Sequence, residues 1–447
     1  MKDNIGIDKH FTGKFYIADE EIAGELIYNK KNGIILLNLI KTLADPMVFG
    51  KSYKDVDIIT GTLNSGAVVT LFKNRCVKNH TQAFQSQQIN YVSKYMIWSK
   101  DIADKRKFHK MRCIVENGLT WSELSRIDSS DFNCIKIKDK FDKKTFDFFG
   151  AKISFSTSLN CELFSYPIKE ESKVYERLMV EIEPKNEQDP SYFISLRDKI
   201  LSFISFAIRD NINVIEQYLY DYNDSYLIGG EITEYYKHTL ITSERNLSIQ
   251  NTIVHEYNFL LSEIATENIN EELTKLEPIF NLYLSLFKYM DMPIEMIFLN
   301  IVQALETFHS RFFYEDKKEK YIKSVMERFG ESKNFKYIEP LLLSDTQKDP
   351  NCSYIILLSR LNDLFIGKND GLFSDYYVKN PQYAQIVADT RHYYTHYGKS
   401  KENKALKGDE LLKAIYVLTS LLEYHICLIL GIDIRQKIVQ RLNKVKI

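Results

Sequence analysis

The sequence predicts an α+β protein in which a β-rich, sandwich or barrel-like domain precedes an all-α helical bundle. Two patterns and the length support this prediction. Short apolar runs that alternate with polar residues fill the first half, whereas after about Thr242 the apolar residues recur at helical spacing. The 447 residues also exceed what one hydrophobic core usually serves. We therefore expect two domains, at residues 1–245 and 246–447.

Turn residues bound the expected strands of the first half. The stretch 24–40 is typical of a hairpin, because Asn32-Gly33 supplies a turn with positive φ. The stretch 57–72 repeats this form around Asn64-Ser65-Gly66. One helix is expected at 192–208, where the apolar spacing becomes helical. Further strands are expected at 95–98, 111–115, 134–137, 152–157, 178–182, 214–222 and 231–240.

The second half predicts a series of helices. Proline suits the first turn of a helix, so Pro293 and Pro381 mark two starts, and Gly398 is expected to end the second of these helices. The expected helices span 253–265, 278–289, 293–312, 354–365, 380–397 and 409–431. The last of them is expected to turn one apolar stripe inward, formed by Leu411, Leu412, Ile415, Leu418, Leu422 and Ile426.

Bulk composition excludes several classes of function. The net charge of −1 gives no global attraction to nucleic acid, so any such contact must come from local charge. One local group is Arg435, Lys437, Arg441, Lys444 and Lys446, although a solvated helix tail explains these residues equally well. The six cysteines form no Cys-x-x-Cys pair and lie near no histidine at metal-ligand spacing. We expect reduced thiols in a cytoplasmic protein with no metal, no cofactor and no membrane span.

The most informative stretch is 388–398, which contains Arg391 and His396. An arginine offers a fixed cation and a planar fork of donors that suits phosphate. A histidine exchanges protons near neutral pH. RNA carries its own nucleophile, the 2′-hydroxyl, so these two groups could cleave it without a metal. A structural alternative is an ion-paired arginine and a histidine that caps the carbonyls at a helix end.

This stretch resembles the Arg-to-His signature of HEPN ribonucleases, in which Asn, Asp or His usually follows the arginine, as His392 does here. The whole chain resembles ApeA-type anti-phage proteins, which join a β-rich N-terminal domain to a C-terminal HEPN domain. The resemblance implies a metal-independent endoribonuclease that leaves a 2′,3′-cyclic phosphate and is activated on infection. It also implies RNA as a partner (tRNA is one candidate), a homodimer through the HEPN domain, and a phage-derived trigger sensed by the N-terminal domain.

Further site residues follow from the same resemblance. Glu306 lies in an Ala-Leu-Glu stretch similar to that of ApeA-type HEPN domains and could pin Arg391, or it could simply flank an apolar stripe. His392 could orient Arg391 or contact phosphate. Supporting or RNA-binding roles are expected for Tyr397, Tyr394, Lys399 and Lys401. The tyrosines could equally well pack against neighbouring helices.

The spacing of the motif sets a geometric condition. On a regular helix, side chains five positions apart point about 140° away from each other, so Arg391 and His396 cannot share one narrow face. Either the helix distorts or a second chain completes the site, and HEPN nucleases are understood to pair two motifs across a dimer. An alternative function is a non-catalytic HEPN module that binds RNA, nucleotide or protein. A third is a carbohydrate- or peptide-binding β-domain carried on a helical dimeriser.

Overall fold

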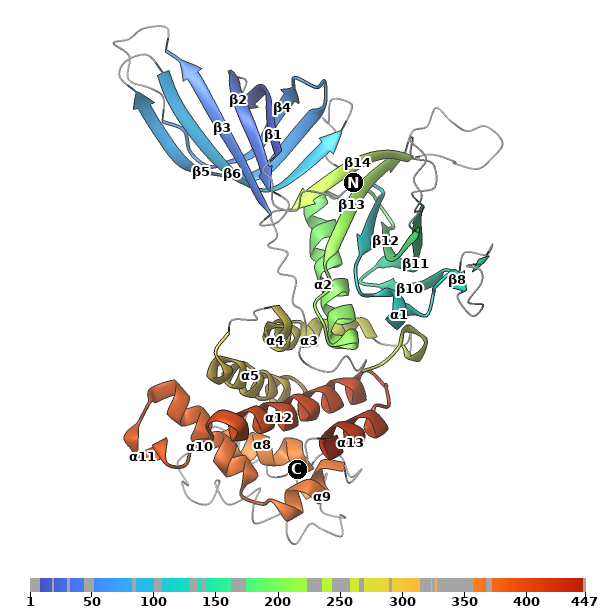
Figure 1. Ribbon diagram of the computed structural model, residues 1–447, viewed down its shortest axis with the longest axis vertical. Helices are drawn as coiled ribbons and strands as arrows, with labels where there is room; N and C mark the ends of the chain where they lie inside the picture. Colours follow the sequence, from blue (N-terminus) through green and yellow to red (C-terminus); the bar gives the residue numbers. More distant parts are fainter. Residues whose placement is uncertain are drawn as a thin grey trace, which may run out of the picture. The chain divides into compact units, whose positions relative to one another are not determined.

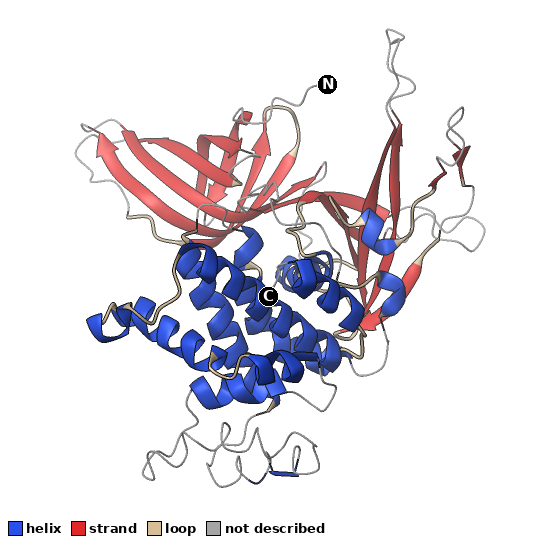
Figure 2. Cartoon of the chain, turned by 60° about the horizontal axis from the view of Figure 1, so that its bottom comes forward, coloured by secondary structure: helices blue, strands red, loops and turns tan. Residues whose placement is uncertain are grey.

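The computed structural model divides the chain into two compact units (Figure 1). The strand unit comprises residues 1–198 and 212–248, and the helical unit comprises residues 199–211 and 249–447. Figure 2 shows that strands dominate the first and helices the second. The structure describes residues 9–17, 20–29, 33–43, 52–82, 86–99, 107–128, 136–138, 142–161, 174–222, 235–242, 258–264, 269–288, 292–313, 323, 326–327, 357–366 and 372–444.

Six antiparallel strands close into a barrel at the start of the strand unit. Their order is β6-β3-β2-β1-β4-β5, and a further pairing of β5 with β6 completes the ring. Closure leaves none of these strands with a free edge over its full length, which removes a common cause of aggregation. The strands are β1 (Lys9–Ile17), β2 (Glu20–Asn29), β3 (Ile34–Thr42), β4 (Val56–Leu63), β5 (Val68–Gln82) and β6 (Ser86–Ser99).

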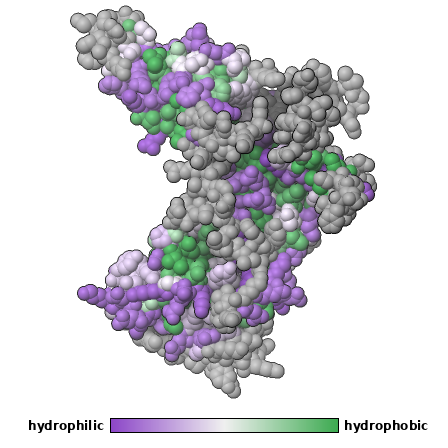
Figure 3. Space-filling view, viewed as in Figure 1, coloured by the Kyte–Doolittle hydropathy of each residue, from purple (hydrophilic) through white to green (hydrophobic). Residues whose placement is uncertain are grey.

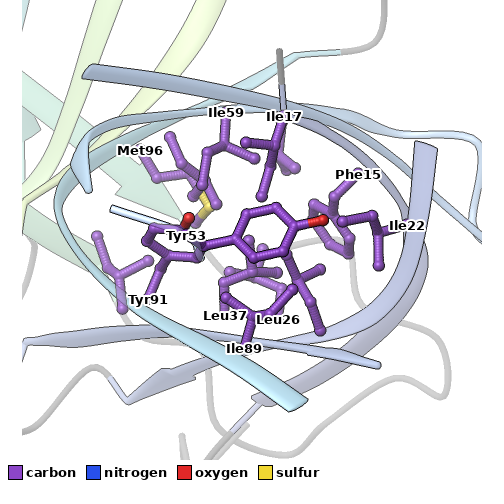
Figure 4. Packing of buried hydrophobic residues seen from close by; sticks show 14 of the residues in the cluster. Phe15, Ile17, Ile22, Leu26, Leu37, Tyr53, Ile59, Ile89, Tyr91 and Met96 are labelled. Atoms are coloured by element: carbon purple, nitrogen blue, oxygen red, sulfur yellow. The ribbon is translucent and has the colours of Figure 1, made fainter. Parts of the chain in front are cut away.

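Side chains fill the interior of this barrel. Successive residues of a strand point to opposite sides, so every second residue contributes to the interior. Figure 4 shows these residues meeting from all sides of the ring: Phe15, Ile17, Ile22, Leu26, Leu37, Tyr53, Ile59, Ile89, Tyr91 and Met96. Each buried side chain of this size contributes about 1.5–3 kcal/mol. The barrel is therefore a packed core.

Strand β6 also begins a second, open part of the sheet. Its end, Tyr95–Trp98, pairs with β14 (Tyr235–Thr242), and the order continues β14-β13-β7-β12-β11-β10. One face of this part is apolar and carries Leu178 and Val180 of β12, and Phe155 of β11 packs edge-to-face on Trp121. The remaining elements are β7 (Lys110–Val115), α1 (Leu119–Ser122), β10 (Lys144–Phe148), β11 (Ala151–Cys161), β12 (Val174–Pro184) and β13 (Val214–Tyr222); a separate two-stranded sheet pairs β8 (Ile127–Asp128) with β9 (Lys136–Ile137).

The chain passes from the strand unit to the helical unit within one helix, α2 (Pro190–Ile208), because residues 199–211 belong to the helical unit. There, Phe206 packs on Phe280 and Tyr283. Asn258 fixes the end of α2, since its side chain donates to the Phe206 carbonyl at 2.9 Å and its backbone N–H to the Ala207 carbonyl at 2.8 Å.

The helical unit is organised around α5 (Ile294–Phe312) and α12 (Gly408–Ile429), which pack against each other. Its other described elements are η2 (Leu261–Glu263), α3 (Ile269–Tyr283), α4 (Ser285–Lys288), α8 (Leu357–Ile366), α9 (Leu372–Lys379), α10 (Tyr383–His396), α11 (Lys399–Glu402) and α13 (Arg435–Lys444). Among the described helices, α12 is long and apolar enough to cross a bilayer, but 72% of its most apolar window is buried inside the unit. A core helix gives the same composition.

A buried carboxylate ties three helices of this unit to the end of α2. Glu423 on α12 is fully buried and pairs with Arg209 at 2.9 Å and with Arg441 of α13. The Tyr283 hydroxyl donates to the same carboxylate at 2.6 Å. Burial alone would raise the pKa of Glu423, but the two guanidinium groups hold it below its usual range. Arg209 has a left-handed backbone with φ of 55°, directly after α2 ends.

The expected fold class, a β-rich domain followed by a helical one, is confirmed, and its β-domain contains a barrel. The expected helix at 253–265 is wrong over its described part, 258–264, which contains only the short turn η2. The helix expected to start at Pro278 begins at Ile269, and Pro278 lies inside it. Leu412 was wrongly placed inward and is 50% exposed, because neighbouring helical residues point about 100° apart and Leu411 takes the buried position.

Removing one partner of Glu423 should destabilise the helical unit. Arg441→Ala should lower its free energy of unfolding by about 3–5 kcal/mol, because a buried carboxylate loses one of its two cations. Arg435→Ala on the exposed side of the same helix is the matched control and should change it by less than about 0.5 kcal/mol. Urea denaturation followed by circular dichroism measures both. Equal midpoints for the two variants would contradict this account of the cluster.

Candidate active site on helix α10

Helix α10 carries all the residues of the motif. It begins after Asn380-Pro381, with Gln382 as its N-cap, and ends at His396. The C-cap is Tyr397, whose left-handed backbone has a φ of 49°. The expectation that Gly398 ends the helix is therefore wrong by one residue: Gly398 has a φ of −73° and precedes α11. A tyrosine in this backbone region is uncommon, because its Cβ is crowded there.

The inner side of α10 is anchored to the segment that follows it. The Thr390 hydroxyl accepts the Leu406 N–H at 3.1 Å, and the Tyr394 hydroxyl donates to the Leu406 carbonyl at 2.9 Å. Asp389 accepts a hydrogen bond from Lys401 at 2.5 Å. These three contacts fix the end of the helix against the segment 399–407. Thr390 and Asp389 directly precede Arg391. Since their contacts hold this part of α10 in one orientation, they also fix the side of the helix from which the Arg391 side chain extends.

Arg391 faces a carboxylate from another helix. Its Nη2 lies 3.6 Å from Oε2 of Glu306 on α5, and both side chains are partly exposed. An ion pair of this exposure contributes only about 0–1 kcal/mol to stability. Its effect is on direction, because the carboxylate limits where the guanidinium can point while the remaining donors stay available. The structure thus brings together two residues that the sequence separates by a long stretch.

His396 and His392 form an exposed pair on another side of α10. Their ring centroids lie 4.8 Å apart, as expected for residues one helical turn apart. In the described part of the chain, neither ring takes part in a hydrogen bond, so His396 caps no carbonyl there. Among these residues no hydrogen bond, ion pair or ring contact joins His396 to Arg391. Both rings are therefore open to solvent, and an exposed imidazole can accept or donate a proton.

The other predicted RNA contacts fall into two groups. Tyr394 is buried and packs against Phe298, and Lys401 is paired with Asp389, so neither is an open contact in this structure. Lys399 is exposed and Tyr397 is 66% exposed. Lys407 lies 5.5 Å from the centroid of the Tyr393 ring, a cation–π pair that sequence reasoning missed. Figure 3 shows hydrophilic residues gathered over α11 and the neighbouring end of α10.

The basic C-terminal group is not an open positive surface. Arg441 is buried against Glu423, and Lys437 lies 3.6 Å from Glu263. The expectation of open local charge is wrong for Arg441, which α13 turns inward, whereas Lys437 stays partly exposed beside its acidic partner; Lys446 and the side chain of Lys444 lie outside the described residues. Among the described residues, no group of three or more His, Cys, Asp or Glu side chains could hold a metal ion.

A buried polar pair lies in the helical core. His309 of α5 contacts Asp363 of α8 at 2.8 Å, and both side chains are fully buried. His425 lies near them, and burial lowers its pKa to about 4 although the Leu364 carbonyl accepts its hydrogen bond. These residues organise the packing of α5, α8 and α12 and offer no surface to a substrate.

Comparison with known proteins agrees with this geometry. A family model described as ApeA N-terminal domain 1 matches residues 10–271, and one described as Apea-like HEPN matches residues 299–436. The second match contains Glu306, Arg391 and His396. No curated protein and no solved structure shows significant similarity to the chain. The first match alone covers more than half of the sequence, and together the two matches place the chain in the family of ApeA-type anti-phage proteins, with an ApeA N-terminal domain and a C-terminal HEPN domain.

Proposed function

We propose that this protein is a metal-independent endoribonuclease of the HEPN type that acts in anti-phage defence. HEPN domains are generally associated with ribonuclease activity. One observation carries the proposal for this chain. An arginine directed by the carboxylate of Glu306 and a pair of exposed imidazoles lie within one short helix. A purely structural Arg–His motif would have its imidazole engaged with carbonyls or carboxylates, and the described residues provide none.

The proposed reaction is an internal transfer within the RNA. His396 takes the proton from a ribose 2′-hydroxyl, and that oxygen attacks the adjacent phosphorus. Arg391 stabilises the charge that develops on the non-bridging phosphate oxygens. The bond from phosphorus to the 5′-oxygen breaks, and a second imidazole protonates this leaving oxygen. The products are a 2′,3′-cyclic phosphate and a 5′-hydroxyl, with no water consumed.

The second imidazole and the correct placement of Arg391 come from a symmetric dimer of helical units. Arg391 points toward α5 and His396 lies on the exposed side, so a single chain leaves the two groups apart. A twofold axis brings two copies of the motif together and supplies two arginines and two histidines to one phosphate. Exposed apolar side chains of the helical unit, Met296 and Leu412, are suited to contact the partner.

Single-stranded RNA, for which a tRNA loop is one source, would reach the site across Lys399, Lys407 and Tyr397. The lysines suit the phosphates and the exposed ring suits an unstacked base. Control belongs to the strand unit, which would sense a phage-derived trigger and restrain the nuclease until infection. Binding of RNA without cleavage is the alternative outcome and would make this a non-catalytic HEPN module.

Loss of either motif residue should abolish cleavage. We expect Arg391→Ala and His396→Ala each to reduce cleavage of a labelled RNA in EDTA by at least about 100-fold. Both side chains are partly or fully exposed, so the melting temperature should change little. His80→Ala, an exposed histidine of the barrel, is the matched control and should cleave normally. RNA cleavage by either motif variant at the wild-type rate would refute the assignment.

Glu306 is expected to act as a positioning residue. Glu306→Gln removes the charge that directs Arg391 and should lower the cleavage rate by about 10–100-fold while leaving KM nearly unchanged. The control is Glu410→Gln, which removes an exposed carboxylate from the first turn of α12. Glu306→Asp should recover part of the rate, because it keeps the charge. If Glu306→Gln instead loses stability and keeps its rate per folded molecule, Glu306 only supports packing.

A further inference from the structure

We propose that the open part of the sheet in the strand unit binds a nucleoside monophosphate or a compound of similar charge and size. A pocket of about 250 Å³ lies on the face of this sheet opposite to the apolar face. Its lining comes from β7, β11, β12 and β13 and includes Arg112, Ser158, Tyr175, Arg177, Tyr218 and Tyr220. All these residues belong to the strand unit.

The strand register explains why these side chains share one face. Arg177 of β12 lies opposite Ser158 of β11. Arg112 of β7 lies opposite Tyr218 of β13. Tyr175 and Arg177 are two residues apart on one strand and therefore point to the same side. Leu178, the residue after Arg177, points to the opposite side, into the core. The lining is thus built by the sheet itself and not by a chance approach of loops.

Positive charge exceeds negative charge around this pocket. The carboxylate of Glu181 forms ion pairs with Lys110 at 2.9 Å, Arg112 at 2.8 Å and Lys143 at 2.9 Å. Burial raises the pKa of Glu181, but the three cations bring it to about 2, so one full negative charge is shared among them. Arg177 adds a further cation, for which the described residues contain no carboxylate partner. A phosphate group supplies the missing anion, and arginine is the side chain best suited to hold it.

Aromatic rings next to these cations suit a flat base. The guanidinium carbon of Arg177 lies 5.8 Å from the Tyr175 ring centroid, and that of Arg112 lies 5.2 Å from the Tyr220 ring centroid. Tyr175 is 39% exposed, so one of its faces is available for stacking. Glu216 also lines the pocket and accepts a hydrogen bond from Tyr218 at 2.6 Å. Its carboxylate can accept donors that a nucleoside carries, namely ribose hydroxyls or a base amino group.

The pocket volume limits the size of the ligand. Pockets for drug-sized ligands usually enclose roughly 300–1,000 Å³, and this pocket lies just below that range. One base with its ribose and phosphate is therefore a better match than a long oligonucleotide. The proposal does not depend on RNA cleavage, because the pocket and the Arg391–His396 motif belong to different units.

Calorimetric titration of the full chain tests this proposal. The protein carries Arg391→Ala, so that phosphate binding at the motif does not contribute to the signal. The probes are AMP, GMP, CMP and UMP, with inorganic phosphate and adenosine as the separate halves of the ligand. We expect at least one nucleotide to bind more tightly than either half. Adding Arg177→Gln should weaken it by about tenfold or more, since a charge-assisted hydrogen bond is lost.

Two further variants make the result specific. Tyr175→Ala should weaken nucleotide binding and leave phosphate binding unchanged, because only the stacking surface is removed. Arg75→Gln, an exposed arginine of the barrel, is the matched control and should bind as the parent does. The proposal is wrong if none of the four nucleotides gives a heat of binding. It is also wrong if the Arg177→Gln protein binds the nucleotide with the same affinity as the parent protein. If inorganic phosphate binds as tightly as the nucleotides, the pocket is a simple anion site and the proposal of a nucleotide site is wrong.

Discussion

His396 lies five positions after Arg391, and on an α-helix this step turns the side chain through about 140°. Helix α10 must also bury Thr390 and Tyr394, which hold Leu406 by both of its backbone groups. With that inner side fixed, Arg391 is left to face Glu306 on α5 and His396 is left exposed beside His392. The anchoring contacts thus place the cation and the base on different sides, and this separation is the reason that the proposed chemistry needs a second chain.

The buried carboxylate of Glu423 plays a comparable part for the helical unit as a whole. It unites α12 with Arg441 of α13, with Tyr283 of α3 and with Arg209, the residue that follows α2. A helical fragment that began at residue 251 would lack Arg209, Phe203 and Phe206 and would leave this carboxylate with one cation. The chain segment 199–211 is therefore a structural part of the helical unit, although it lies within the sequence of the β-rich half.

Local signals were predictable from the sequence, and long-range pairing was not. The hairpin turns around Gly33 and Gly66 have the positive φ that their sequences indicated, and the motif helix was placed to within a few residues. Closure of the barrel depends on the pairing of β1 with β4 and of β3 with β6, which are not consecutive strands, and no turn signal encodes these pairings. Arg441 looked like a surface residue because its acidic partner is 18 positions away, and the partner of Arg209 is 214 positions away. Lys407 was missed because a cation–π pair leaves no spacing pattern.

The central claim is that Arg391 of one chain and His396 of its partner act on the same phosphate. The most direct test mixes purified Arg391→Ala and His396→Ala proteins, allows their subunits to exchange, and measures cleavage of a labelled RNA in EDTA. Each variant alone should be inactive. Half of randomly formed dimers contain one chain of each kind and hold one arginine and one histidine at the shared phosphate, a combination that neither variant alone provides. The mixture should therefore cleave RNA clearly faster than either variant, at no more than half of the wild-type rate. A mixture that stays as inactive as its components, although exchange is shown to be complete, would contradict a site shared between chains.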